Sequence, residues 1–527
     1  MSRKIEDLES RGRPPRENKP RRAATRSSRS LPSAGSQDLS WPVLRSAAQF
    51  VREAPFKIAG ASVAILIPCF WHTHLEAGDL ASHTYNAWLA QLISRGQAPG
   101  LYVVNQWCNV LFDYLLLGLT RAMGFAMGEK VAVSICVLLF FWGAFALVSA
   151  MAGRAAWSIA PLLAMLSYGW VFSIGFFNLY LASGLSLWAL ALVWCGAGWE
   201  LAFLVPLVLL ISRAHLLGIV WVVAGGIYLA LARALPKRWH PLLIGAALVM
   251  YFGLRQGLLS IFEEYPRSPN TLPWLAGADQ LVFYGPVYFL VAIPLIAFAT
   301  MTVIAALIKN WHSLWPKIAV SLPFYGVLAA VAFFAPGGLV VPQFEGAMNL
   351  LPDRITLYAA IIGCCVLGSL PLRRWQTGVF AMLTLAFFSL LYADTAKVNA
   401  MEEKIHALIA SLPPHERVLQ ILNPVNCRIG LTIGHVVDRA CIGHCFSYSN
   451  YEPGSLQFRV RATPGNRIVT AHEHDSTAMQ AGQYQMDPSE LPAEQIYFCG
   501  RKVTDICIRP LSLSQEDEDS DAVTPRW

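Results

Sequence analysis

The chain has 527 residues, of which 55% are hydrophobic, 12% aromatic and only 14% charged, whereas soluble domains carry about 25% charged residues. This composition excludes an ordinary soluble multidomain protein. Apolar runs recur from Phe56 to Ala396, and they predict an all-α polytopic membrane bundle over residues 56–396.

The net charge of +7 is spread unevenly, because residues 1–55 hold a dense set of basic side chains interleaved with Pro, Ser and Gly. Such a segment predicts a disordered cytoplasmic arm. Nucleic-acid binding is one interpretation of a basic arm. Beside a membrane span, a topology anchor that touches anionic lipid is the better one, so no nucleic-acid partner is expected. The first apolar run has no cleavage site and is expected to stay as a signal anchor.

Eleven apolar runs approach the roughly 20 residues needed to cross a bilayer. The predicted spans are 57–72, 103–122, 131–152, 156–174, 179–198, 201–233, 240–257, 281–308, 318–335, 355–372 and 376–394. The run 201–233 is interrupted by Ser212 to His215, so two half-helices or a re-entrant segment are the alternatives to one span.

A cytoplasmic amino terminus in the inner (plasma) membrane would place the Lys and Arg excess on alternate connections. The connections predicted inside contain Arg121, Lys130, Arg233, Lys237, Arg238, Lys309, Lys317, Arg373 and Arg374. Arg154 falls on the outer side, against this rule.

After Ala396 the composition changes to that of a soluble domain, predicted for residues 397–513 as α/β or mainly β. Strand-like stretches such as RVLQILNPV and LQFRVRAT alternate with the turns EPGS and TPGN. Eleven spans would put this domain in the extracytoplasmic space. Residues 514–527 are acidic and are predicted to be a disordered end.

The predicted outer domain has an odd number of cysteines, and an extracytoplasmic compartment permits disulfides. They are Cys427, Cys441, Cys445, Cys499 and Cys507. The motif CIGHC could instead bind a metal, but it has no second matching pair, so bridges or unpaired thiols are favoured.

The first outer loop, residues 73–102, begins in the stretch HTHLEAGD. It continues into an expected interfacial helix from Leu80 to Arg95, which has an apolar stripe and ends at Gly96. Asp79 precedes the first turn and has two compatible interpretations. It is an amino-terminal helix cap, or a rigidly held general base that faces a cleft at the outer surface.

A metal site in this loop is an alternative, because His72, Glu76, Asp79 and His83 follow one another at helical steps of four, three and four. Gly78 argues against an unbroken helix through them. No metal ligand is therefore assigned, and a divalent metal stays open as a cofactor.

The segment GFFNLYLASGL is interpreted as packing. Its Gly184 favours close helix contact, and Asn178 is expected to hydrogen-bond between helices.

The whole arrangement resembles the GT-C superfamily of membrane glycosyltransferases, such as protein O-mannosyltransferases and lipid A aminoarabinose transferases. It has a basic arm, one span, a long outer loop with an early acidic residue, about ten further spans and a terminal outer domain. The acid of EAGD would carry the family's catalytic aspartate onto Asp79. The resemblance implies inverting transfer of a sugar from a polyprenyl-phosphate donor to a glycan, lipid or protein acceptor on the outer face. The loop has no DxD or paired Glu-Asp motif, which argues against a metal-dependent version.

A lipid phosphate would need cationic partners near the outer surface. Arg354 in PDRITLY is the best candidate, and Arg255 lies at another predicted outer end. Both alternatively snorkel to headgroups. Arg213 and His215 interrupt an apolar run, where ionisable residues usually face a cavity, unless SRAH only caps a broken helix. The complete predicted substrate-binding set is Glu76, His83, Arg213, His215, Arg255, Glu345 and Arg354.

Two other classes of protein remain as hypotheses. A transporter or flippase of a lipid-linked precursor would use Arg213 and His215 at a midplane site and would have two similar halves, but the sequence has no clear internal repeat. A non-catalytic assembly protein would bind a partner through its outer domain.

Overall fold

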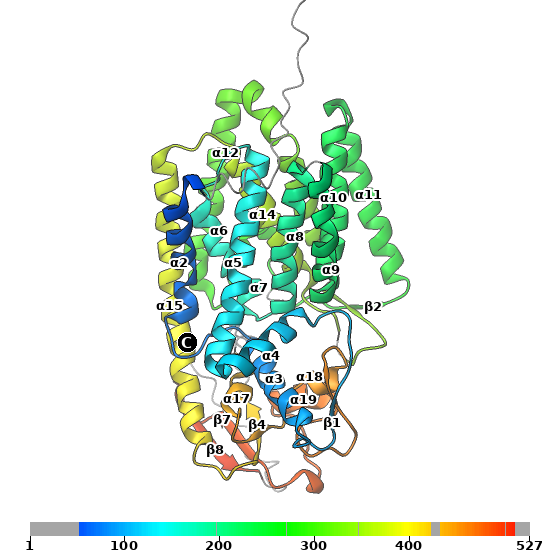
Figure 1. Ribbon diagram of the computed structural model, residues 1–527, viewed down its shortest axis with the longest axis vertical. Helices are drawn as coiled ribbons and strands as arrows, with labels where there is room; N and C mark the ends of the chain where they lie inside the picture. Colours follow the sequence, from blue (N-terminus) through cyan, green and yellow to red (C-terminus); the bar gives the residue numbers. More distant parts are fainter. Residues whose placement is uncertain are drawn as a thin grey trace, which may run out of the picture. The chain divides into compact units, whose positions relative to one another are not determined.

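The computed structural model describes residues 52–196, 198–269, 271–345, 347–422, 433–500 and 502–511. The predicted basic arm up to residue 51, the acidic end and Cys427 lie outside these residues. The described part is mostly helical and has a small sheet near its carboxyl end (Figure 1), as the predicted fold class requires.

Two groups of helices build the described part. The apolar bundle contains α2 (Pro55–Phe70), α5 (Phe125–Ala152), α6 (Ala160–Ser167), α7 (Trp170–Ser173), α8 (Phe177–Cys195), α9 (Leu204–Ala214), α10 (Leu216–Ala234), α11 (His240–Leu259), α12 (Phe289–Ile318), α13 (Ser321–Phe334), α14 (Leu351–Gly368) and α15 (Arg374–Ile409). The polar end contains α3 (Leu80–Ser94), α4 (Leu111–Met123), α17 (Val436–Ala440), α18 (Glu452–Ser455) and α19 (Glu473–Gln480).

Seven helices of the described residues are long and apolar enough to cross a membrane, so eleven spans are not confirmed. They are Phe125–Ala152, Phe177–Cys195, Leu216–Ala234, Lys237–Leu259, Pro286–Ile318, Leu351–Gly368 and Arg374–Ile409. Three shorter apolar helices accompany them, at Pro55–Phe70, Ala160–Ser173 and Ser321–Phe334.

One predicted span was wrong in kind, and for a second the alternative of two half-helices is confirmed. The run 103–122 is divided between strand β1 (Leu101–Val103) and the 13-residue helix α4, which carries Asp113 in its first turn and Arg121 in its last. The run 201–233 is two helices, because His215 takes an extended backbone with φ −163° and ψ 139° between α9 and α10. That break is the half-helix alternative.

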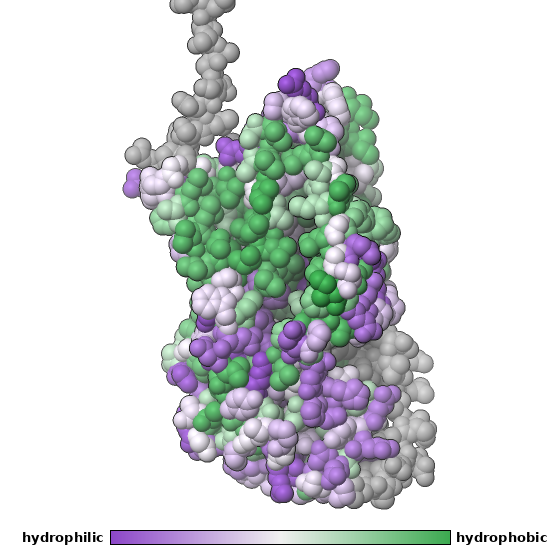
Figure 2. Space-filling model, turned by 90° about the vertical axis from the view of Figure 1, so that its right-hand side faces the viewer, coloured by the Kyte–Doolittle hydropathy of each residue, from purple (hydrophilic) through white to green (hydrophobic). Residues whose placement is uncertain are grey.

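The most buried candidate span is α8, at the centre of the bundle, whereas α11 has no buried residue over its span. The outer helices expose large apolar side chains such as Val249, Leu290 and Leu385. Figure 2 shows this hydrophobic surface over the bundle and hydrophilic residues gathered over the opposite end. An apolar surface of this extent fits hydrocarbon as its solvent.

The basic residues also show that two connections, the one with Lys130 and the one with Arg154, lie at the opposite ends of the bundle from those predicted for them. Lys130 donates from Nζ to the backbone oxygen of His72 at 2.8 Å, so it lies at the end of the bundle where α2 leads into the first loop. Arg154 instead donates from Nη2 to the backbone oxygen of Gly368 at 3.0 Å, and therefore lies at the opposite end, near Arg373. The reason is that 103–122 does not cross the bundle.

The carboxyl-terminal domain is built on a four-stranded sheet with the strand order β5-β4-β7-β8. Strands β5 (Phe446–Ser447), β4 (Arg417–Ile421) and β7 (Glu494–Phe498) are parallel, and β8 (Ile506–Pro510) runs antiparallel to β7. The 36-residue helix α15 continues from the bundle into this domain and contacts α17 and β8. The predicted domain boundary at 396/397 therefore falls inside one helix.

The first loop and the carboxyl-terminal domain form one polar layer against the bundle (Figure 1). Strand β1 pairs with β6 (Val460–Ala462) in antiparallel register, with Tyr102 opposite Arg461. Helix α3 packs on α17. The stretch that carries Asp79 is thereby enclosed between the bundle and residues more than 300 positions later in the chain.

Candidate functional site

The backbone at Asp79 is fixed against the turn between α7 and α8. Gly78 and Asp79 donate their amides to the backbone oxygens of Ser173 at 2.9 Å and Ile174 at 2.8 Å. Gly175 has φ +87°, and a Cβ there would lie 2.4 Å from the Asp79 nitrogen. Only a glycine leaves room for this approach, so the turn determines where the carboxylate sits.

The side chain of Asp79 is not a helix cap. It occupies the amino-terminal cap position of α3, but it makes no capping hydrogen bond to the described backbone. Instead its charge interacts with the Tyr451 phenol, and its Oδ1 lies 3.7 Å from Nε2 of His435. The side chain is 18% exposed, so this carboxylate is accessible.

His435 is itself held by a second carboxylate. Its Nδ1 lies 3.1 Å from Oδ2 of Asp438, and its ring centroid is 4.9 Å from that of Tyr451. Burial alone would lower the pKa of His435, but the hydrogen bond and charge of Asp438, with the charge of Asp79, raise it. The three side chains form a row, Asp438, His435 and Asp79, in which His435 is hydrogen-bonded to Asp438 and lies 3.7 Å from Asp79.

The charge of the Arg354 guanidinium interacts with Asp79 and with the Tyr451 phenol. Its guanidinium lies 4.2 Å from the centroid of the Phe176 ring, a cation–π contact. Among the described residues Nε of Arg354 has no hydrogen-bond partner, which leaves a donor for an anion. His215 lies close enough for its charge to interact with Arg354, but its Nδ1 caps α10 by accepting the Leu217 amide at 3.1 Å.

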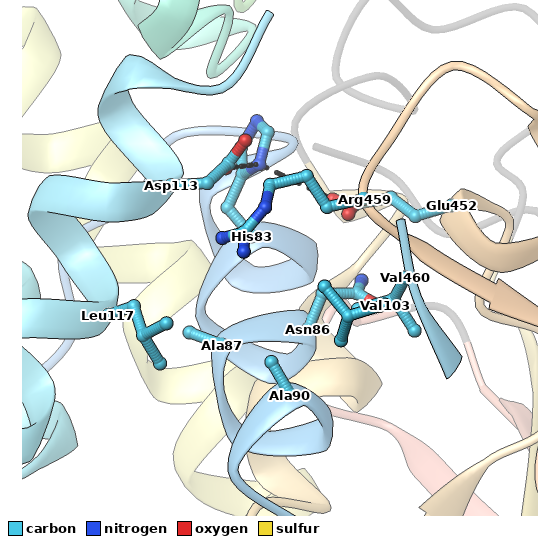
Figure 3. A pocket seen from close by; sticks show the side chains of 10 residues that line it. All are labelled: His83, Asn86, Ala87, Ala90, Val103, Asp113, Leu117, Glu452, Arg459 and Val460. Atoms are coloured by element: carbon cyan, nitrogen blue, oxygen red, sulfur yellow. Dashed lines mark ion pairs between the residues drawn. The ribbon is translucent and has the colours of Figure 1, made fainter. Parts of the chain in front are cut away.

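His83 lies in a neighbouring pocket rather than beside Asp79 directly. Its Nδ1 is 2.9 Å from Oδ1 of Asp113 and 3.4 Å from Oε1 of Glu452, and Figure 3 shows it between them, with Arg459 lining the same pocket. Burial lowers the pKa of His83, but the two carboxylates outweigh it and raise the pKa to about 9. His83 is therefore a cation at neutral pH. Asn178 orients Asp113 by donating to its Oδ2 at 3.2 Å.

Arg213 does not lie at the centre of the bundle. Its guanidinium is 4.5 Å from the ring centroid of Trp107 and 5.8 Å from that of Tyr114. Arg459 lies over the same Tyr114 ring at 4.0 Å, and Trp107 is 60% exposed. Arg213 therefore belongs to the rim of the polar layer.

Glu345 joins the loop before α14 to the carboxyl-terminal domain. Its Oε1 is 2.9 Å from Nδ1 of His472, and its Oε2 accepts the Glu473 amide at 3.1 Å. Burial and the charges of Glu345 and Asp79 raise the pKa of Glu473 to about 7. A carboxyl poised at neutral pH near Asp79 is typical of functional sites.

Glu76 belongs to a second and more deeply buried cluster, centred on Arg439. The guanidinium lies 2.7 Å from Oε1 of Glu129, 2.9 Å from Oε1 of Glu402 and 3.8 Å from Oε2 of Glu76. It also donates to the backbone oxygen of Leu75 at 3.0 Å. The cluster ties α17 to the first loop, α5 and α15.

Two predicted features are not assembled around Asp79. Arg255 lies on α11, where Nε donates to the backbone oxygen of Phe334 at 2.9 Å and Nη2 is 3.8 Å from Glu264, and these partners do not belong to the Asp79 setting. The four loop residues considered as a metal site, His72, Glu76, Asp79 and His83, do not converge on one point. His72 contacts the Tyr392 backbone oxygen at 3.2 Å. Glu76 lies in the Arg439 cluster, Asp79 lies beside His435, and His83 lies between Asp113 and Glu452.

The cysteines confirm the bridges favoured from the sequence. Cys441 is bonded to Cys445 and Cys499 to Cys507, so the CIGHC thiols are not metal ligands here.

The sequence did not identify the partners that the carboxyl-terminal domain supplies. Tyr451 stands next to EPGS, which was interpreted only as a turn, and His435 lies in no recognisable motif. The side chains that complete the site are Asp113, His435, Asp438, Tyr451, Glu452, Arg459 and Glu473. Local spacing cannot reveal them, because they come from segments that meet only in the fold.

The arrangement provides an accessible carboxylate, a histidine 3.7 Å from it, and an arginine whose Nε has no hydrogen-bond partner among the described residues. These groups lie at the boundary between the apolar bundle and the polar layer. Such a set can deprotonate a hydroxyl and stabilise a leaving anion. No known protein family, curated protein or solved structure matches this chain.

Proposed function

We propose that the protein is an inverting membrane glycosyltransferase that moves a sugar from a polyprenyl-phosphate donor to a glycan, lipid or protein acceptor. The observation that carries the proposal is the setting of Asp79. Its backbone is fixed by the Gly175 turn, its side chain is freed from capping, and it is accessible beside His435 and Arg354.

In the proposed reaction the acceptor hydroxyl attacks the anomeric carbon while Asp79 removes its proton. A new carbon–oxygen bond forms as the bond from the anomeric carbon to the phosphate oxygen breaks. The phosphate leaves with the electron pair, and Arg354 stabilises its charge. Asp79 takes up the proton, and the imidazole of His435, which Asp438 orients, lies 3.7 Å away.

The proposed orientation has the polar layer outside an inner membrane. Both disulfides of the described residues lie in the carboxyl-terminal domain, and disulfides persist in oxidising compartments. Arg154 and Arg373 lie at the opposite end of the bundle, where a cytoplasmic surface would collect positive charge.

The transporter hypothesis is less well supported. It needs Arg213 and His215 at a midplane site. Arg213 instead packs on Trp107 and accepts the Val110 amide at its backbone oxygen, and His215 caps α10.

The test is transfer of radiolabelled sugar from polyprenyl-phosphate donors by the purified chain in lipid nanodiscs. We expect Asp79→Asn to reduce transfer about 10²–10⁴-fold, the usual contribution of a general base. Asparagine keeps the size of the side chain and removes only its charge and basicity, so folding should be unchanged.

Glu263→Gln is the matched control, because Glu263 is an exposed carboxylate in β2 (Glu263–Tyr265), outside the Asp79 setting. If the native chain and Asp79→Asn transfer sugar at equal rates, Asp79 is not the general base. Label incorporation by neither, across several sugar donors, would count against the glycosyltransferase itself.

A further inference from the structure

A histidine pair and a glutamate lie together beside the Arg439 cluster. His74 belongs to the first loop, and Glu402 and His406 lie one turn apart on α15. One ligand atom from each lies within 4.8 Å of the other two. None of these residues has a part in the proposed transfer.

The separations in this group suit a shared metal better than hydrogen bonds. His74 Nδ1 and His406 Nε2 are each 3.7 Å from Oε1 of Glu402, which is too long for a hydrogen bond. Two ligand atoms that are each about 2.1 Å from a tetrahedral zinc ion lie about 3.4 Å apart. The observed nitrogen–oxygen separations of 3.7 Å are close to this ligand–ligand distance.

Glu402 also has a carboxylate oxygen to spare. Its side chain is fully buried, and its Oε1 pairs with Nε of Arg439 at 2.9 Å. Among the described residues neither Oε2 of Glu402 nor Nε2 of His406 has a hydrogen-bond partner. Buried polar atoms are normally satisfied, so both atoms call for a ligand.

The charges point to a divalent cation. Three buried carboxylates, those of Glu76, Glu129 and Glu402, surround the single guanidinium of Arg439. With all four groups ionised, the cluster has a net charge of −2, which is costly in a dry environment. One divalent ion at the adjoining triad would bring the sum to zero.

From this geometry and charge balance we infer that His74, Glu402 and His406 bind a divalent transition metal of the zinc class. Two imidazoles and one carboxylate are a donor set that zinc uses. The side chain of His406 is 36% exposed, although its Nε2 is buried. The ion would join the first loop to α15, and through Glu402 it would stabilise the contact with Arg439.

The experiment measures metal content and thermal unfolding of the full chain, purified without a polyhistidine tag, stripped with chelator and dialysed against Zn²⁺. We expect about one zinc per chain and an unfolding midpoint that rises by several degrees, because a ligand that binds the folded state stabilises it. In His74→Ala and His406→Ala we expect zinc affinity to fall by more than the roughly 10–100-fold that loss of an outer partner costs.

The matched control is His474→Ala. His474 Nδ1 lies the same 3.7 Å from a carboxylate oxygen, that of Asp475, but this pair lacks a second histidine, and His474 is 92% exposed. It should keep native zinc content. If the histidine variants fail to fold, Co²⁺ bound to the native chain decides by its visible spectrum, which should show nitrogen ligation in low-coordinate geometry.

Zinc content in the native chain no higher than in the His74→Ala, His406→Ala double variant would overturn the site. So would an unchanged content in both single variants. The cluster would then balance its charge by a proton on Glu76. This readout is independent of sugar transfer, so the site can fail while the proposed function stands, and the reverse.

Discussion

Glu76 and Asp79 stand three residues apart in the first loop, yet the fold gives them opposite settings. Glu76 shares one guanidinium with two other carboxylates in a closed cluster. Asp79 is the accessible acid between a tyrosine, a histidine and an arginine. The partners, more than the residue type, decide whether a carboxylate serves as a counterion or stays available for chemistry.

The same short helix, α17, supplies both settings. Arg439 points to the closed cluster, while Asp438 and the preceding His435 serve Asp79. A change in how α17 docks would therefore affect stability and the site together. Single variants of Arg439, Arg354 and Glu76 separate the effect on stability from the effect on the site.

The largest expected effect comes from removing the guanidinium. Arg439→Leu leaves three carboxylates buried without a cation, and breaking such a group costs about 3–5 kcal/mol. Thermal and denaturant unfolding in nanodiscs would measure the loss. Arg417→Leu, on strand β4 with its guanidinium 5.8 Å from the Tyr448 ring centroid, should cost no more than about 1 kcal/mol. Equal losses in the two variants would show that the cluster does not hold the polar layer in place.

The second effect is on transfer. Arg354→Gln should reduce transfer about 100-fold, because one preorganised donor to a developing charge is worth 10²–10³-fold. Arg354→Lys should recover part of the rate by keeping the charge. Arg255→Gln is the control, since Arg255 is an arginine whose partners, Phe334 and Glu264, do not belong to the Asp79 setting. A similar loss in the Arg255 and Arg354 variants would mean that the rate follows the integrity of the bundle.

The smallest effect concerns Glu76. Burial, and then the charge of Glu402, raise the pKa of Glu76 well above 4.5. Its folded-state pKa is therefore higher than its unfolded one, so the stability that its proton contributes is complete below about pH 4.5 and is lost as pH rises through the raised pKa. Glu76→Gln imitates the protonated form and should change the free energy of unfolding at pH 7 by about 1 kcal/mol or less.

Unfolding midpoints of chelator-treated protein between pH 4 and 9 would check this. The native chain should lose more stability with rising pH than Glu76→Gln, and sugar transfer should be nearly the same in both. If the unfolding midpoints of the native chain and Glu76→Gln change with pH in parallel, Glu76 is ionised throughout this pH range, as an exposed glutamate would be.

The tertiary structure corrects the sequence interpretation where polar residues interrupt apolar runs. Asp113 and Arg121 were included in a predicted span, but they lie on α4 in the polar layer, where Asp113 pairs with His83. Ser212 to His215 were recognised as a break, and the break is real. Hydropathy averages over a window, so it could not separate a polar-layer helix from a crossing one.

Within the site, Asp79 and Arg354 were chosen from the sequence and do lie close enough for their charges to interact. Arg255 met the same sequence criterion, a cation at the outer end of a span, and lies elsewhere. Position along a span gives depth in the bundle but not direction around it. Helix packing alone sets that direction.

The sequence by itself predicted that most of this protein lies in a membrane. It also predicted the order of the apolar bundle and the polar carboxyl-terminal domain along the chain. The long apolar runs require hydrocarbon, the change after Ala396 requires a water-facing domain, and an acid follows the first apolar run. The tertiary structure decided which acid meets which partner. Asp79 and His435 are 356 positions apart in the chain, and contacts at that separation follow from docking of whole elements, which no local periodicity encodes.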